Sequence, residues 1–134
     1  MIILAVLIFQ MVNPTMGQDI LQTNLRWNSA STINLKTNES SSYSCSFISS
    51  SSEIQWLQKN GTRVKHFAVT STSGSWLNIS TNGTISFQVT EGSIAGVITI
   101  AKDGEGTSVT LDFTAQHPDA IKQRFWISSV QPEN

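Results

Sequence analysis

The chain has 134 residues, enough for one domain with a hydrophobic core of its own. Its formal net charge is −1, with eight Lys and Arg residues scattered among nine Asp and Glu residues, and this balance excludes an electrostatic footprint for nucleic acid. Only 13% of the residues are charged, and the abundance of Ser, Thr and Asn suits strands and turns better than surface helices.

The chain begins with an apolar run over residues 1–12, which Asn13-Pro14 ends. Small residues follow in Thr15-Met16-Gly17, so we expect a secretory signal peptide over residues 1–17 and a mature chain that begins at Gln18. No Lys or Arg precedes the run, and a buried helix or a membrane anchor are the alternatives. Because the run is short for a bilayer span, we expect a secreted, extracellular protein with no membrane insertion.

Four Asn-x-Ser/Thr sequons agree with export from the cell. They begin at Asn38, Asn60, Asn78 and Asn82. We therefore expect a glycoprotein that carries sugar at these positions.

Short runs that alternate apolar and polar residues fill the chain from about residue 31 to residue 113. Tyr43-Ser44-Cys45-Ser46-Phe47 and Ile85-Ser86-Phe87-Gln88-Val89 are examples. A period of two indicates strands with one buried face, as in antiparallel sheets. Turn signals such as Asn60-Gly61 and Asp103-Gly104 separate the runs, and strands at this spacing are typical of a sandwich or a barrel. The region is predicted to be all-β.

The last segment, residues 114–134, lacks this alternation. Residues 118–127 are compatible with a short helix followed by a frayed end, or with the truncated start of a longer element. Phe125 and Trp126 are too apolar to be left in water, so they are expected to fold back on the domain or to mark a contact surface. Both alternatives stay open, and the segment is treated as a C-terminal extension.

Residues 33–113 resemble a domain of the immunoglobulin superfamily. Cys45 within Tyr43-Ser44-Cys45-Ser46-Phe47 is similar to the B-strand cysteine, and Trp56 follows at the C-strand tryptophan spacing. Residues 94–100 lie where the F strand belongs, with Gly96 kept, Ile98 in place of the usual Tyr and Ile100 in place of the second Cys. The resemblance implies an antiparallel, immunoglobulin-like β-sandwich over residues 18–113; other sandwiches, such as fibronectin type III domains, share the alternation alone.

Cys45 is the only cysteine, so no internal disulfide can form. It is either a small buried hydrophobe packed against Trp56 or an exposed thiol that joins two copies into a homodimer. Its alternation with Tyr43 and Phe47 favours burial. The expected core residues are Cys45, Trp56, Ile98, Ile100 and Leu111.

No motif for catalysis stands out. His66 and His117 lie far apart, and neither has an acidic residue or a cysteine at metal-ligand spacing. A nucleophile elbow and a phosphate-binding glycine loop are both missing from the sequence. We therefore expect a protein that is not an enzyme and that has no cofactor or metal.

The immunoglobulin resemblance also implies a partner-binding face made by the G, F and C strands. Its outward positions are Gln55, Leu57, Val97, Thr99 and Ala101, and the rim is formed by Lys102, Asp103 and Glu105. The expected partner is a protein, either a cell-surface receptor or a second copy, in cell recognition or immune modulation. Alternatively these are ordinary strand residues, covered by the C-terminal extension.

A second function of a different class is open: a small secreted sandwich that binds carbohydrate or serves a structural role. Sugar binding needs an exposed aromatic platform, and Trp27 and Trp76 are the candidates.

Overall fold

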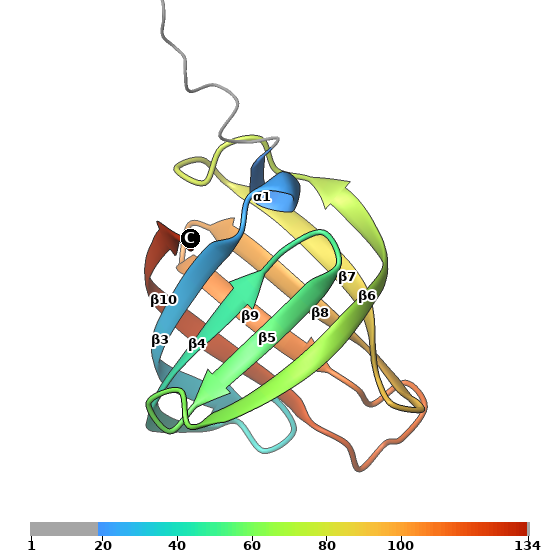
Figure 1. Cartoon of the computed structure of the whole chain (residues 1–134). Coiled ribbons are helices and arrows are strands. Elements are labelled where there is room, and N and C mark those ends of the chain that lie inside the picture. The colour runs from blue at the N-terminus through green and yellow to red at the C-terminus, as the bar shows by residue number, and fades with distance from the viewer. Residues whose placement is uncertain (1–18, 134) are drawn as a thin grey trace, which may run out of the picture.

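The computed structural model describes residues 19–133 and shows an all-β protein (Figure 1). One short helix, α1 (Asp19–Gln22), precedes the strands. Eight strands follow: β3 (Leu25–Asn34), β4 (Glu39–Ser49), β5 (Glu53–Gln58), β6 (Arg63–Ser75), β7 (Gly83–Glu91), β8 (Ile94–Asp103), β9 (Gly106–Asp112) and β10 (Lys122–Pro132).

The strands close into one antiparallel barrel. Each strand pairs with the next along the chain, and β10 pairs with both β9 and β3. The predicted immunoglobulin-like β-sandwich is therefore wrong, while the all-β prediction is confirmed. A period of two shows only that each strand has one buried face, which holds for two packed sheets and for one sheet curled on itself.

The end of the chain differs from the predicted extension. Lys122–Pro132 form a barrel strand rather than a helix with a frayed end, so the folded unit runs past residue 113 to the end of the described chain. Arg26 Nε and Nη2 donate to the Glu133 carboxylate at 2.8 and 3.0 Å, and Glu133 N donates to Asn24 O at 2.9 Å. These contacts fix the end of β10 to the start of β3. The predicted signal peptide, residues 1–17, lies outside the described residues.

Inward side chains fill the barrel. An eight-stranded barrel is just wide enough for side chains to meet at its axis. The largest fully buried side chains include Trp27, Phe47, Ile54, Phe87, Ile98, Ile100, Leu111 and Phe125. The five residues expected in the core, Cys45, Trp56, Ile98, Ile100 and Leu111, are all buried.

One end of the barrel, here called the closed end, is plugged by apolar side chains. Helix α1 lies over it (Figure 1), and Ile20 from this helix is buried in the core. Trp76, from the β6–β7 loop, is also buried, and its Nε1 donates to Thr81 O at 2.9 Å. The ring centroids of Trp76 and Trp27 lie 5.8 Å apart, and the two rings close this end of the interior.

The opposite end, here called the mouth, is formed by the loops at residues 35–38, 59–62, 92–93 and 113–121. Phe113 from the last of these loops lies over Gly96, where an added Cβ would come within 2.3 Å of the Phe113 ring. Glycine is therefore required there, because any other residue would displace the ring that partly covers the mouth.

Candidate functional site

The mouth contains a pocket of about 210 Å³. Its walls are mostly apolar and include the rings of Trp56, Phe67 and Phe113, and two charged residues also line it. The full lining is Trp56, Lys65, Phe67, Glu91, Ile94, Leu111, Phe113, Ala120 and Ile121. Mouths of β-barrels with apolar walls and a few polar groups are common sites for small ligands.

The strand register explains why two charged residues face this interior. Lys65 lies directly across from Trp56, and cross-strand partners point to the same side of a sheet. Glu91 is in phase with Phe87 and Val89, which are buried. Lys65 Nζ and Glu91 Oε1 lie 3.5 Å apart at the entrance.

Two buried donors on β5 have no hydrogen-bond partner among the described residues: Trp56 Nε1 and Gln58 Nε2. Trp56 is 8% exposed and Gln58 7% exposed. Tyr43 Oη donates to Gln58 Oε1 at 2.6 Å, so the amide oxygen is occupied and the amide nitrogen is left over. Buried polar groups are nearly always hydrogen-bonded. Two buried donors without a partner on the same face of one strand therefore need an explanation.

Aromatic contacts hold Trp56 in place. The Phe47 ring stacks on it with centroids 5.7 Å apart, and the Phe125 ring meets it edge-on at 5.3 Å. Both contacts have the geometry that aromatic pairs favour. The indole N–H therefore occupies a defined position.

The Cys45 thiol lies in the same region, across from Gln58. Burial raises the pKa of the Cys45 thiol, and the indole N–H of Trp56 opposes that rise. Burial also raises the pKa of Tyr43; Cys45 adds to this effect and Arg63 opposes it. A protonated thiol is a weak acceptor, so it does not replace an oxygen as the partner of Trp56.

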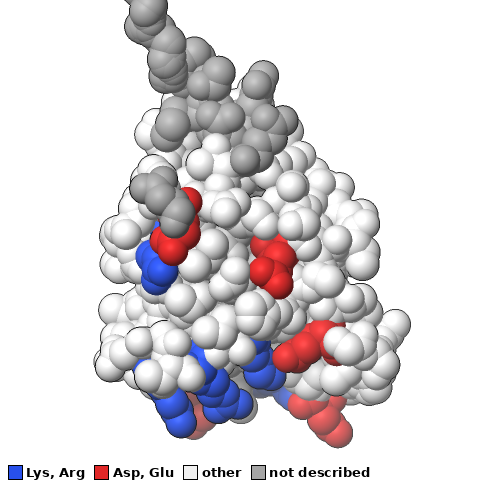
Figure 2. Space-filling model, in the orientation of Figure 1, with Lys and Arg blue, Asp and Glu red and all other residues white. Residues whose placement is uncertain are grey.

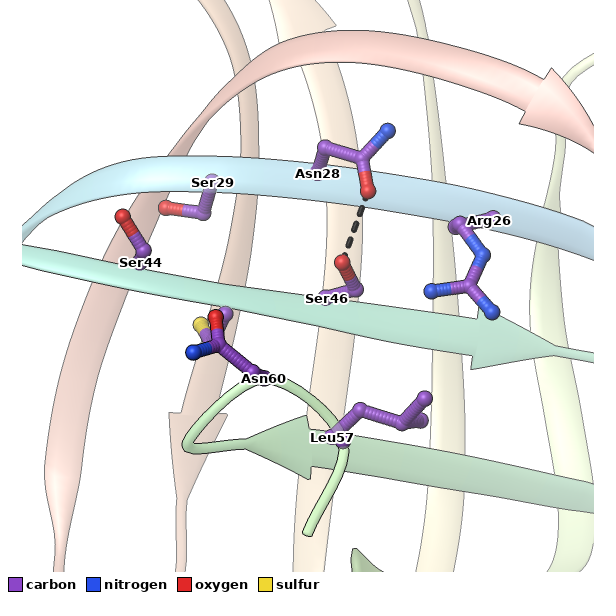
Figure 3. A pocket seen from close by; sticks show the side chains of 9 residues that line it. Arg26, Asn28, Ser29, Ser44, Ser46, Leu57 and Asn60 are labelled. Atoms are coloured by element: carbon purple, nitrogen blue, oxygen red, sulfur yellow. Dashed lines mark hydrogen bonds between the residues drawn. The ribbon is translucent and has the colours of Figure 1, made fainter.

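A larger groove of about 410 Å³ lies on the outer face of β3, β4 and β5 (Figure 3). Several of its polar side chains are paired with neighbours: Asn28 accepts from Ser46 Oγ at 2.7 Å and donates to Ser129 Oγ at 3.0 Å. Arg26 is engaged by Glu133. A polar hollow beside β3 and β10 is similar, since Gln123 Nε2 donates to Thr32 Oγ1 at 2.8 Å. Neither place leaves a buried donor without a partner, so the mouth is the stronger candidate.

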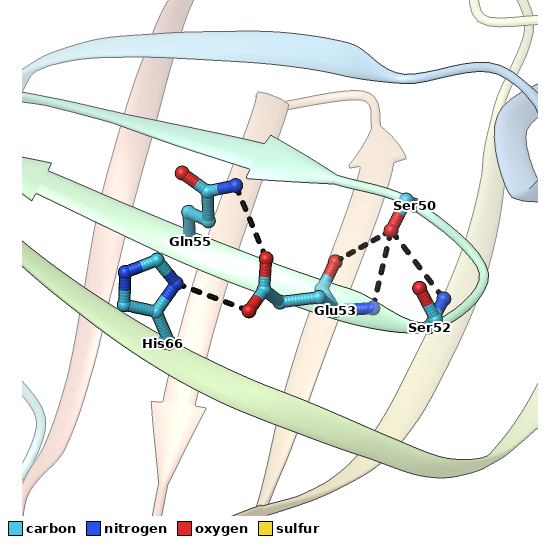
Figure 4. A network of polar contacts seen from close by, with 5 residues as sticks. All are labelled: Ser50, Ser52, Glu53, Gln55 and His66. Atoms are coloured by element: carbon cyan, nitrogen blue, oxygen red, sulfur yellow. Dashed lines mark hydrogen bonds and ion pairs between the residues drawn. The ribbon is translucent and has the colours of Figure 1, made fainter.

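A polar network lies on the outer side of β5 and β6 (Figure 4). Glu53 accepts from Gln55 Nε2 at 3.1 Å and contacts His66 Nδ1 at 3.0 Å, while Ser50 Oγ binds both the N–H and the carbonyl oxygen of Glu53. Within residues 19–133, no group of three or more His, Cys, Asp or Glu side chains is placed to hold a metal ion. In the same part of the chain, no helix has the length and apolar character needed to cross a lipid bilayer.

The structure does not bring the predicted partner-binding face together. Gln55 and Leu57 lie on the outside of β5, and Val97, Thr99 and Ala101 lie on the outside of β8, with β6 and β7 between them. The rim residues Lys102, Asp103 and Glu105 lie at the closed end. Neighbouring C and F strands belong to the immunoglobulin arrangement, which the barrel replaces.

The four sequons are exposed and lie at the two ends of the barrel. Asn38 and Asn60 are in the mouth loops, with positive φ angles of 63° and 57°. Asn78 and Asn82 are in the β6–β7 loop at the closed end. Glycosylation itself stays a prediction.

The sequence reasoning did not single out Gln58, Lys65 or Glu91 as site residues. A signal was present: Lys65 is in phase with the apolar Phe67, and Glu91 is in phase with Val89. A charged or amide side chain on the apolar phase of a strand is unusual, because such groups need a partner inside.

Trp27 and Trp76, the candidates for a sugar platform, are buried and cannot present a face to a carbohydrate. Comparison with protein-family models, with curated proteins and with solved structures finds no match to this chain.

Proposed function

We propose that this protein is a binding protein that holds a small, largely apolar molecule in the mouth of the barrel. The observation that carries the proposal is the pair of unpaired buried donors, Trp56 Nε1 and Gln58 Nε2, on the inner face of β5. Trp56 lines the apolar pocket, and Gln58 is the next inward residue on the same strand. A buried donor without a partner costs about 1–3 kcal/mol. A ligand that brings an acceptor oxygen relieves this cost.

The site is prepared for a ligand before it binds. Phe47 and Phe125 hold the Trp56 ring, and Tyr43 holds the Gln58 amide. Donors that are already oriented lose little conformational entropy when a ligand binds. Barrel strands supply this rigidity better than loops do.

The size of the pocket limits the ligand. At about 210 Å³ it is smaller than the sites of roughly 300–1,000 Å³ that hold drug-sized molecules. A single ring with a short side chain fits this description, whereas a folded protein surface does not. The residues of the predicted protein-binding face do not adjoin, and for this reason we propose a small-molecule site instead.

Nuclear magnetic resonance tests the proposal through the four tryptophan indole N–H signals. A panel of phenyl compounds with short alcohol, acid, amide and amine side chains is titrated into the labelled protein. We expect a saturable shift of the Trp56 indole signal and the Gln58 side-chain amide, assigned with Trp56→Phe and Gln58→Leu. Trp126, which lies on the outer side of β10, supplies the control variant Trp126→Phe. If no compound shifts the Trp56 signal, the site is a water-filled hollow and the proposal is wrong.

We also propose that the protein acts outside the cell. The proposal is supported by the apolar run over residues 1–12 and by the four exposed sequons, which begin at Asn38, Asn60, Asn78 and Asn82. Expression in a eukaryotic secretory host, followed by intact mass before and after glycan removal, tests it. A chain retained in the cell with its first residues intact would contradict it.

A further inference from the structure

We infer that the molecule bound in the mouth is a small organic anion, such as a carboxylate, and that its charged group pairs with Lys65. The inference rests on the proposed function and adds the charge of the ligand to it.

The two buried side-chain polar atoms that lack a partner among the described residues are both donors, and both lie on β5 in this half of the barrel. Trp56 Nε1 and Gln58 Nε2 are donors without partners among the described residues, and Lys65 brings further donors at the entrance. The acceptor on Gln58 is already taken by Tyr43. An ionised carboxylate only accepts hydrogen bonds, so it complements this set of groups.

Lys65 is placed to meet such a group. It lies opposite Trp56 on the inner face of β6, so its aliphatic stem starts on the apolar wall and its ammonium reaches the entrance. The separation of 3.5 Å from Glu91 is longer than the roughly 2.7–2.9 Å of a charge-assisted hydrogen bond. Both side chains are more than one third exposed, at 37% and 38%, and ion pairs of this kind contribute little. A ligand carboxylate can therefore replace Glu91 at small cost.

Basic residues lie near Lys65 at the mouth, and acidic residues such as Asp119 lie at the same end. Arg63 precedes Lys65 on β6, and Lys59 lies in the loop before it. Figure 2 shows Lys and Arg side chains at the lower end of the molecule, which is the mouth in Figure 1, with Asp and Glu side chains at the same end. A ligand amine would have to pair with Glu91 and would add a donor where donors already lack partners.

A matched series of ligands tests the charge: 3-phenylpropionate, 3-phenylpropan-1-ol and 3-phenylpropylamine, each measured by calorimetry. We expect the acid to bind the unaltered protein about tenfold more tightly than the alcohol, with the amine weakest. Lys65→Gln should remove this preference. Glu91→Gln, which frees Lys65 from its partner, should strengthen binding of the acid. Lys102→Gln, at the closed end, is the matched control and should leave all three affinities unchanged.

The outcomes separate this inference from the proposed function. If acid and alcohol bind equally well, or if the amine binds best, the ligand is not selected as an anion, while the mouth remains a binding site. If Lys65→Gln leaves the preference for the acid intact, another group recognises the anion and the assignment to Lys65 is wrong. If none of the three binds and the Trp56 signal does not move, the proposed function fails together with the inference.

Discussion

At the residue scale, the mouth depends on a few side chains that are held by close contacts. Gly96 lets the Phe113 ring lie over β8. The ring centroids of Phe113 and Phe67 lie 5.5 Å apart. The Phe113 backbone N–H donates to Ile121 O at 2.9 Å, which ties the ring to the loop that covers the pocket. A change at one of these positions alters both stability and the shape of the site.

Gly96→Ala tests this close approach. The added Cβ would lie 2.3 Å from the Phe113 ring, so the ring must move and the free energy of unfolding should fall by about 1–3 kcal/mol. Urea denaturation measures the change. Gly104→Ala is the control, because nothing lies within 4 Å of a Cβ there. Equal effects of the two substitutions would contradict the packing of Phe113 over Gly96.

Cys45 provides a second test at this scale. The thiol is buried and burial raises its pKa, so both accessibility and thiolate content are low in the folded protein. We expect a disulfide reagent to label it slowly under native conditions and fast in denaturant. Rapid labelling of the folded protein, or a dimer sensitive to reductant, would place Cys45 on the surface instead.

At the element scale, β10 closes the barrel by pairing with β3, the strand that lies farthest from it along the chain. Its partners are β9 and β3, and its end is held by the pair between Arg26 and Glu133. The hydrogen bonds from Arg26 hold the pKa of the Glu133 carboxyl below its ordinary range. Asp112, at the end of β9, also has a lowered pKa, chiefly because the Thr114 hydroxyl donates to it.

The lowered pKa values of Glu133 and Asp112 predict that the folded protein loses stability in acid. A carboxyl whose folded pKa is lowered stabilises the protein above its unfolded pKa of about 4, and the stabilisation is lost as pH falls through the folded value. The denaturation midpoint should therefore decrease below about pH 4. Glu133→Gln should show a lower midpoint at neutral pH and a smaller decrease on acidification. Glu105→Gln, in an exposed turn, is the control. An unchanged pH profile for Glu133→Gln would contradict the role of the Arg26 contact.

At the scale of the whole molecule, the local pattern predicts the strands but not how they join. The alternation around Phe47 and Phe87 indicates strands with a buried face, and the structure has strands there. Closure into a barrel depends on which distant strands pair, and the spacing of Cys45 and Trp56 instead resembled an immunoglobulin sandwich. The last strand was missed because Phe125 is its only fully buried side chain, so its alternation is weak.

The same limit applies to the site: the local pattern predicts which residues are buried but not which residues they meet. Burial of Trp56 and Cys45 was predicted from their phase in the strands. Their environment was not, because the contact of Trp56 with Phe125 joins strands far apart in the sequence. Lys65 and Glu91 likewise come from different strands and meet only once the barrel forms.

Because β10 closes the barrel, a truncated chain that lacks this strand should not fold. A protein that ends at residue 113 lacks β10, so β9 and β3 lose their common partner and the interior loses Phe125. We expect this chain to be unfolded or aggregated by circular dichroism and amide dispersion, whereas a chain that ends at Glu133 folds. A stable, cooperative fold for the shorter chain would favour a unit that does not need β10.

The most direct test of the central claim, that the mouth holds a small ligand, is a crystal structure of the protein grown with 3-phenylpropionate. The predicted result is the ring against Trp56 and Phe113, the carboxylate beside Lys65, and a ligand or bridging oxygen within roughly 3 Å of Trp56 Nε1. An empty mouth, with the compound absent or bound in the outer groove of Arg26, Asn28 and Leu57, would contradict the claim.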